Sequence, residues 1–593
     1  MKKSTLYKII AILLPFLLVL LIELSLRIIG YGENYQLFKK VNADKKPDYL
    51  EMNSTIAGKY FKNNGLTSDN QSDLFLKTKT DSTFRVFVQG ASTVVGFPFY
   101  RGGSFPRMLK QRLALTFPDK NIEVVNTGIT AVNSYTLWDV TDEIIAQKPD
   151  LIIIYAGHNE YYGALGVGSS VSYGNYPFLI RTYLRLKSYR FFQLLENSYP
   201  KLFSSSEKKL NRNETTLMEV MAKEQRIPYN SHVYKDGLVQ FESNLKKILK
   251  KYKRNNIPVI ISTVVSNEKD IKPFISDSIP NKDKFLESLA DENSKTSGLA
   301  LHNAMAAYTL GKFYLQKNQD SAKKYLHLAK ELDFLRFRAP EKINDIIKDF
   351  AEKFDIPLVD MEHVFLEHSP DNVIGDELLT EHVHPNIKGQ FLMADAFYNK
   401  IKELDFLKDW DDYITFDEAF QDIPTTQIDS MQGKLVIEDL KKSWPYNLNM
   451  SGARPMSIQR SNTSYEERKA LDIYRKIMPW DQVMAEAYRK YENDSDYNKA
   501  LQVAESLIFE FPEQGEVYRM AGNICLKMND TNKAVYYFLK CNQLEKSSKS
   551  AQQLASVYIK LHQIELARKT LIEAKRKGFN DQPLDNMLKE IKE

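Results

Sequence analysis

The sequence predicts an α/β protein: a three-layer domain built on a parallel sheet, with an all-α helical solenoid after it and one transmembrane helix before it. Three observations predict this architecture. Val/Ile-rich runs alternate with helical patterns, as in a parallel sheet buried on both faces. Small residues recur at a period of about 34 near the carboxyl terminus, which is a solenoid signal. An unbroken apolar run occupies the amino terminus.

Length and composition exclude several classes of protein. A chain of 593 residues is too long for one core, so we expect several domains. The hydrophobic and charged fractions, 43% and 26%, are those of a globular protein. A net charge of +5 gives no basic footprint for nucleic acid. Two cysteines are too few for a disulfide framework, and we expect both to be core residues.

The amino-terminal run predicts a transmembrane anchor over residues 1–30. Three lysines precede an apolar stretch from Ile9 to Ile29, which as a helix would extend about 31 Å. Glu23 and Arg27 interrupt it at a spacing that lets them pair. The lysines favour a cytoplasmic amino terminus, which would place the bulk of the chain in the periplasm. A cleaved signal peptide is the alternative, although no small-x-small site follows the run.

Five apolar runs predict the strands of the sheet: 84–90, 122–128, 150–157, 257–266 and 356–361. They lie within a domain predicted over 81–404, which follows a polar approach segment at 31–80. We expect insertions in this domain at 161–256 and at 300–333.

Helical repeats are predicted over 464–593, after an irregular connector at 405–463. The pattern resembles tetratricopeptide repeats, in which small residues recur where paired helices touch. The insertion at 300–333 resembles one such hairpin. These repeats would present a concave surface to a protein partner.

Ser92 follows the first predicted strand, in "VQGASTVV", and is the candidate nucleophile. A serine needs a base within hydrogen-bond reach and a carboxylate that orients the base. In "TEHVHP", Glu381 precedes His384 by three residues and can bind its Nδ1–H, which leaves Nε2 for the serine proton. His382 is the competing base, but Leu379 stands three residues before it.

Candidate oxyanion donors follow three of the strands. They are the backbone N–H of Ser92, that of Gly128 in "NTGIT", and the side-chain amide of Asn159 in "AGHNE". In an open parallel sheet, ligands bind at the carboxyl ends of the strands, so these groups can meet in one crevice. His158, Glu160 and His382 are expected to line the same pocket.

In this order, the motifs around Ser92, Gly128, Asn159 and His384 resemble the SGNH (GDSL-like) hydrolase family. The resemblance covers roughly residues 80–270 and 335–405, and with the anchor and repeats the chain is similar to large bacterial members of that family. It implies a flavodoxin-like domain, a Ser-His-Asp/Glu acyl-enzyme mechanism, and esterase or acyl-transferring activity without a metal or other cofactor.

Two departures from the family pattern stand out: Gly-Ala-Ser-Thr replaces Gly-Asp-Ser, and Glu381 stands where Asp is usual. The α/β-hydrolase fold is a poorer match, since no glycine stands two residues after Ser92. A zinc site built from His158, Glu381, His382 and His384 is an alternative with loose spacing.

Two functions are therefore considered. The first is a membrane-tethered periplasmic serine esterase, acting on or transferring an acyl group such as O-acetyl of an envelope glycan or lipid. The second is a scaffold that binds a partner through its repeats and carries an inactive hydrolase domain. In neither case do we expect nucleic acid as a partner.

Overall fold

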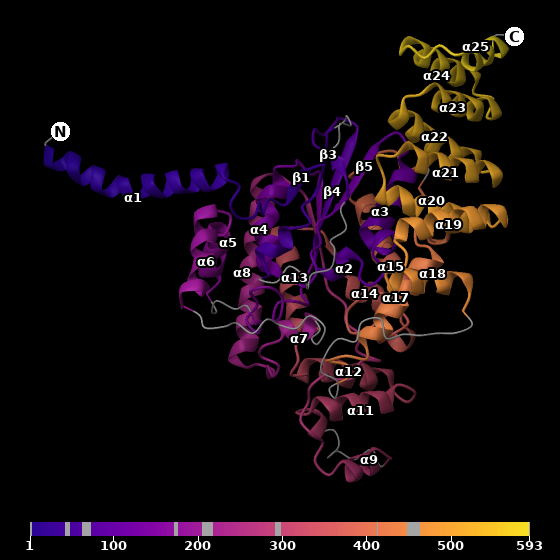
Figure 1. Ribbon diagram of the computed structural model, residues 1–593. Coiled ribbons are helices and arrows are strands. Elements are labelled where there is room, and N and C mark those ends of the chain that lie inside the picture. Colours follow the sequence, from indigo (N-terminus) through magenta and orange to yellow (C-terminus); the bar gives the residue numbers. More distant parts are fainter. Residues whose placement is uncertain are drawn as a thin grey trace.

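The computed structural model describes residues 3–41, 48–61, 73–170, 176–203, 217–290, 298–411, 413–447 and 463–591. Figure 1 shows a central sheet flanked by helices, with a stack of helices ending at the carboxyl terminus and one long helix, α1, extending away from the body.

The central sheet has five parallel strands in the order β5-β4-β6-β7-β8. The strands are β4 (Thr83–Gly90), β5 (Asn121–Asn126), β6 (Leu151–Tyr155), β7 (Val259–Ser262) and β8 (Leu358–Val359). In chain order this is the flavodoxin-like arrangement 2-1-3-4-5, so the predicted fold class is confirmed. The order of the strands reverses between β4 and β6, which is where ligands bind in such sheets.

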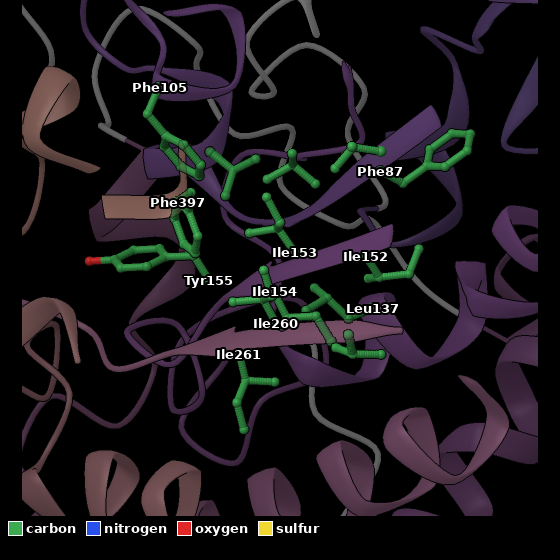
Figure 2. Packing of buried hydrophobic residues seen from close by; sticks show 14 of the residues in the cluster. Phe87, Phe105, Leu137, Ile152, Ile153, Ile154, Tyr155, Ile260, Ile261 and Phe397 are labelled. Atoms are coloured by element: carbon green, nitrogen blue, oxygen red, sulfur yellow. The ribbon is translucent and has the colours of Figure 1, made fainter. Parts of the chain in front are cut away.

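Helices cover both faces of the sheet and bury all of its strand residues except Asn121 and Leu358, which are half-buried. On one side lie α3 (Phe105–Thr116), α14 (Met361–Glu367) and α15 (Ile387–Glu403), and on the other α4 (Ser134–Ile145), α8 (His232–Arg254) and α13 (Glu341–Phe354) (Figure 1). The rings of Phe105 and Phe397 stack with centroids 5.4 Å apart, and Ile153 and Ile260 are fully buried (Figure 2). This burial explains the continuous Val/Ile runs of the sequence.

Residues 31–80, predicted as a polar approach segment, contain a second sheet. Its antiparallel strands β1 (Phe38–Lys40), β2 (Tyr49–Met52) and β3 (Phe75–Leu76) follow one another in space. Phe75 packs edge-to-face on Phe87 of β4 and Phe38 packs on the same ring at a tilt, so this sheet shares the main core. The 3-10 turn η1 (Ile56–Lys59) follows β2, and its Ile56 belongs to the same core.

The two predicted insertions are helical. Within 161–256 lie α5 (Pro177–Leu186), α6 (Arg190–Phe203) and α7 (Leu217–Met221), but the segment ends in α8, which packs on α4 as part of the sheet's helical layer. Within 300–333 lie α11 (Ala304–Tyr314) and α12 (Gln319–Leu332), which pack against each other. The helix α9 (Lys282–Ala290) precedes them in the chain.

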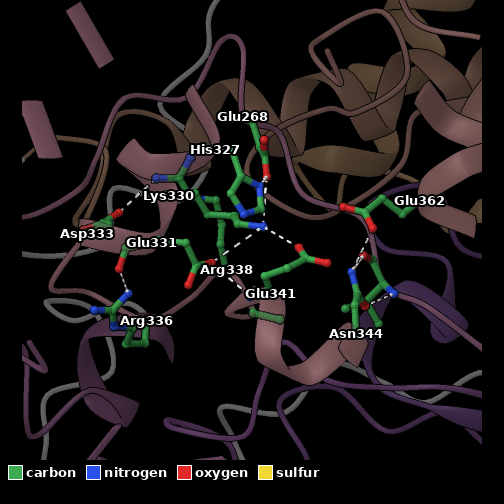
Figure 3. A network of polar contacts seen from close by, with 12 residues as sticks. Glu268, His327, Lys330, Glu331, Asp333, Arg336, Arg338, Glu341, Asn344 and Glu362 are labelled. Atoms are coloured by element: carbon green, nitrogen blue, oxygen red, sulfur yellow. Dashed lines mark hydrogen bonds and ion pairs between the residues drawn. The ribbon is translucent and has the colours of Figure 1, made fainter. Parts of the chain in front are cut away.

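A buried ionic network joins the α11–α12 hairpin to the sheet domain (Figure 3). Lys330 of α12 lies 2.8 Å from Glu268 and 3.3 Å from Glu341 of α13. Beside it, Arg338 and Asp333 form a second buried pair at 3.0 Å. The Glu268 carboxylate holds the pKa of Lys330 above its usual range, against the effect of burial. The hairpin is therefore attached by charges that are removed from water.

The carboxyl-terminal part is all helix. The predicted connector 405–463 contains α16 (Phe416–Gln421) and α17 (Gln427–Leu440), and successive helices then pack as neighbours. They are α18 (Tyr465–Tyr474), α19 (Trp480–Asn493), α20 (Tyr497–Glu510), α21 (Gly515–Lys527), α22 (Thr531–Glu545), α23 (Ser548–Lys560), α24 (Ile564–Arg576) and α25 (Gln582–Glu590).

Small residues occupy the contacts between these helices. A Cβ on Gly522 would lie 2.9 Å from the Phe538 ring, and Cys525 and Cys541 are fully buried free thiols. The assignment of the helices from α18 to α25 to the tetratricopeptide class stays a prediction.

The amino-terminal helix α1 (Lys3–Ile28) is long and apolar enough to cross a membrane over Ile10–Ile28, with a mean hydropathy of 2.3. A signal sequence has the same properties. Glu23 and Arg27 form the predicted ion pair at 2.7 Å.

Candidate active site

Ser92 lies at the carboxyl end of β4, in the first turn of the short helix α2 (Ser92–Val95). Gly90 permits this turn, because a Cβ there would lie 2.4 Å from the Tyr155 carbonyl oxygen of the neighbouring strand. Gly96 ends the turn with φ +90°, a conformation that favours glycine. Two glycines therefore hold the serine at the reversal point of the sheet.

Ser92, His384 and Glu381 form one chain of hydrogen bonds. The Ser92 Oγ lies 2.7 Å from His384 Nε2, and His384 Nδ1 lies 2.5 Å from Glu381 Oε1. Because a carboxylate only accepts, Nδ1 carries the imidazole proton and Nε2 accepts from the serine hydroxyl. His382, the competing base, instead contacts the other oxygen of Glu381.

Glu381 is completely buried and surrounded by donors. Its Oε1 accepts the backbone N–H groups of Val383 at 3.2 Å and His384 at 2.7 Å. Its Oε2 accepts the Tyr446 hydroxyl at 2.5 Å. Hydrogen bonds to the charged form favour ionisation of a carboxyl group, so this environment suits a carboxylate. The extra methylene of Glu relative to Asp is accommodated by the tight turn that Glu381 shares with His384.

Tyr446 is a residue of this site that the sequence did not reveal. It belongs to the segment predicted as an irregular connector. Its hydroxyl contacts Glu381, although 65 positions separate the two residues in the chain. Phe274 packs edge-to-face on both Tyr446 and His382. No motif surrounds this tyrosine, and only the return of the chain over the sheet domain brings it here.

The His384 imidazole is held neutral. Burial lowers its pKa to about 3, although the Glu381 carboxylate favours the charged form. The ring of Phe97 lies over it, with centroids 4.7 Å apart. A neutral imidazole with a free Nε2 lone pair can take a proton from serine.

A cavity of about 180 Å³ opens beside Ser92 and His384. Asn159, His158, Glu160 and His382, predicted as site residues, all line it. Apolar side chains form much of the remaining wall: Phe97, Val132, Met218, Met221, Phe337 and Leu440. A dry cavity of about 150 Å³ can hold a benzene-sized molecule, so this space suits a short acyl group or a similar small moiety.

The three predicted oxyanion donors differ in whether they face the cavity and in whether they already have a hydrogen-bond partner. Among the described residues, the Ser92 N–H and the Asn159 amide have no hydrogen-bond partner, and both residues line the cavity. Gly128 does not line it, and its N–H donates to Asn126 Oδ1 at 2.9 Å. The structure therefore leaves two of the three donors available to a ligand.

His158 and Glu160 support the cavity wall. Nδ1 of His158 accepts the Ala339 N–H at 3.3 Å, and burial lowers the pKa of this histidine to about 3. Glu160 accepts the Ser134 hydroxyl and the Gln240 amide, each at 2.8 Å. Burial raises the pKa of Glu160 to about 7. Glu160 is thus engaged by the surrounding protein, whereas Nε2 of His158 is buried with no hydrogen-bond partner among the described residues.

The alternative of a zinc site finds no matching geometry. Across the part of the chain that the structure describes, no three His, Cys, Asp or Glu side chains are grouped as metal ligands. Glu381, His382 and His384 are instead joined to one another by hydrogen bonds.

The sequence matches no protein-family model, and no curated protein is significantly similar to it. Among solved structures, a GDSL-like lipase from Bacteroides thetaiotaomicron aligns over 56% of this chain and 93% of its own, with 13% identity and a TM-score of 0.27. An acetylxylan esterase from Geobacillus stearothermophilus, solved as a catalytic mutant, aligns over 56% of this chain and 98% of its own, with 14% identity and a TM-score of 0.27. These similarities are distant, and no functional assignment follows from them.

Proposed function

We propose that this protein is a serine esterase, with Ser92 as nucleophile, His384 as general base and Glu381 as the carboxylate that orients it. The observation that carries the proposal is the continuous hydrogen-bond chain from Ser92 Oγ through the imidazole to Glu381. Nucleophile, base and orienting acid in this geometry define the triad arrangement of acyl transfer.

The reaction follows from these contacts. Ser92 Oγ attacks the ester carbonyl carbon while its proton passes to His384 Nε2. The carbonyl oxygen becomes negatively charged and is stabilised by the Ser92 N–H and the Asn159 amide. When the intermediate collapses, the alcohol leaves with the proton from Nε2. Water, or a second alcohol, then attacks the acyl-serine with the same proton transfers in reverse order.

The substrate that we propose is a short-chain acyl ester, such as an O-acetyl group, on an envelope glycan or lipid. The volume of the cavity supports a small acyl group. The apolar helix α1 supports a location at a membrane, with the site on the periplasmic side. We further propose that the carboxyl-terminal helices act as tetratricopeptide repeats and recruit a protein partner.

A series of aryl esters tests the proposal. The purified full chain in detergent is assayed with acetyl, butyryl and octanoyl esters of one phenol, beside the Ser92→Ala variant. We expect turnover of the acetyl ester, weaker turnover of the octanoyl ester, and none above background in the variant. If the folded wild-type chain turns over none of them, or the variant keeps its activity, the scaffold function becomes the better explanation.

A further inference from the structure

Helices α5 and α6 expose apolar side chains beside the base of α1. Six of them form what we call the outer apolar stripe: Tyr176 (69% exposed), Phe178 (72%), Leu179 (54%), Leu186 (41%), Tyr189 (53%) and Leu195 (51%). The buried side chains of α5, including Ile180 and Leu184, face the protein. Phe178, Leu179 and Leu186 lie on one face of α5 by their spacing, and apolar groups this exposed on one face mark an interaction surface.

The start of α6 is attached to the end of α1. Glu23 of α1 accepts the Phe191 N–H at 2.8 Å. Just beyond α1, Glu33 and Gln193 exchange two hydrogen bonds, at 2.9 and 3.2 Å. In Figure 1, α5 and α6 lie at the base of α1, where this helix leaves the body of the protein. A membrane-spanning helix fixes the bilayer surface near its own end, so α5 and α6 lie at that level.

Basic side chains adjoin the stripe. Arg185 stands seven residues after Phe178, which places both on one face of α5. On α8, Lys247, Lys250 and Arg254 are exposed and, within the described ranges, form no ion pair. Two effects lower the pKa of Lys247. The larger is the loss of water where its side chain lies against the protein, and the second is the positive charge of Arg181, Lys250 and Arg185 nearby. These cations therefore repel one another unless an anionic surface compensates them.

We propose that the outer apolar stripe and the basic residues of α8 rest on an anionic lipid bilayer, with α5 and α6 in its interface. The inference rests on α1 as a membrane helix and is independent of catalysis. Amphipathic helices with aromatic and leucine side chains on one face and cations nearby bind in this way. Such contact would add to the hydrogen bonds between α1 and α6 in fixing the orientation of the sheet domain relative to the membrane.

Quenching by brominated lipids tests the contact. The full chain is placed in nanodiscs of phosphatidylethanolamine and phosphatidylglycerol, with bromine on the upper acyl chain. An interfacial helix buries its apolar face about 5–10 Å into the boundary, within reach of this bromine. We expect the tryptophan emission added by Phe178→Trp to be quenched, relative to the wild-type background.

Three comparison variants make the result decisive. The tryptophan of Ile477→Trp replaces a side chain that is also exposed (65%) but lies beyond α18, and its emission should not be quenched. That of Leu17→Trp, within α1, should be quenched and reports insertion. Adding Lys247→Glu and Lys250→Glu to Phe178→Trp should reduce the quenching. Equal quenching of Phe178→Trp and Ile477→Trp, no quenching of Leu17→Trp, or quenching of Phe178→Trp that the two glutamates leave unchanged overturns the proposal.

Discussion

The imidazole of His384 accepts the hydroxyl of Ser92 at 2.7 Å, although 292 positions separate the two residues in the chain. The relationship depends on the sheet. β4 carries Ser92 to the reversal point, and the loop before α15 carries His384 to the same edge.

Glu381→Gln should reduce kcat strongly with little change in KM. The amide is nearly isosteric but cannot stabilise the imidazolium that forms on His384. In a serine protease the equivalent change of the triad acid lowers kcat about 10⁴-fold, and we expect a loss of about that order. Steady-state kinetics on the acetyl aryl ester measure it. A variant within tenfold of wild type would remove Glu381 from the mechanism.

Tyr446→Phe should have a smaller effect and a diagnostic pH signature. Without the hydroxyl donor, more of the Glu381 charge acts on the imidazolium, so the pKa of His384 should rise and the acid limb of kcat/KM should move to higher pH. We expect a loss in kcat of about 10- to 100-fold, since a hydrogen bond to a charged group contributes about 1.5–3 kcal/mol and each 1.4 kcal/mol is about a factor of ten in rate. An unshifted limb would mean that Tyr446 has only a structural role.

The wild-type pH profile should retain activity in mild acid. The active form is the neutral imidazole, which exists above its pKa, and burial lowers the pKa of His384 to about 3. The acid limb of kcat/KM in the free enzyme should therefore lie below the ordinary histidine value of about 6.5. A limb at 6.5 or above would show that the imidazole is not held neutral by burial.

Asn159→Ala and Gly128→Ala should separate the predicted oxyanion donors. Removing one such donor lowers kcat about 10²- to 10³-fold, and we expect this for Asn159→Ala. Gly128→Ala should change kcat much less, because its N–H already binds Asn126. Its new Cβ would lie 3.0 Å from the Val95 backbone nitrogen, so a lower thermal midpoint is expected instead. The reverse ranking of the two kcat values would contradict this placement of the donors.

Lys330→Met should destabilise the protein without changing the chemistry. It leaves the buried Glu268 carboxylate with only His327 beside it, at 3.1 Å, and breaking a buried pair in this way costs about 3–5 kcal/mol. Urea unfolding measures the loss, while KM and kcat of the folded fraction should stay at wild-type values. Lys342→Met is the control, since its pair with Asp345 is exposed and should contribute about 1 kcal/mol or less. Equal stability of the two variants would contradict the role of the network.

The sequence was most informative where residues lie close together or follow a period. The five apolar runs became the five strands, and the Glu381–His384 spacing predicted their hydrogen bond, because both follow from local geometry. It was least informative where distant segments meet. The β1–β3 sheet lies in a segment without strong patterning, and Tyr446 reaches Glu381 only through the packing of a long connection.

Gly128 illustrates a third limit. A glycine after a strand is compatible with an oxyanion donor, and the sequence predicts one at Gly128. The direction of its N–H depends on Asn126, two residues earlier, whose side chain accepts it at 2.9 Å. A residue type alone does not determine the direction of a backbone donor, so such an assignment needs coordinates.

The most direct test of the proposed catalyst is labelling by a fluorophosphonate probe. The folded full chain should be modified at Ser92 with one probe per molecule, as peptide mass spectrometry would show. Labelling should vanish in Ser92→Ala, slow by orders of magnitude in His384→Ala, and persist in Ser82→Ala, which changes an exposed serine. A folded wild-type chain that takes no probe, or a Ser92→Ala variant labelled as fast as wild type, would contradict the assignment of Ser92 as the nucleophile.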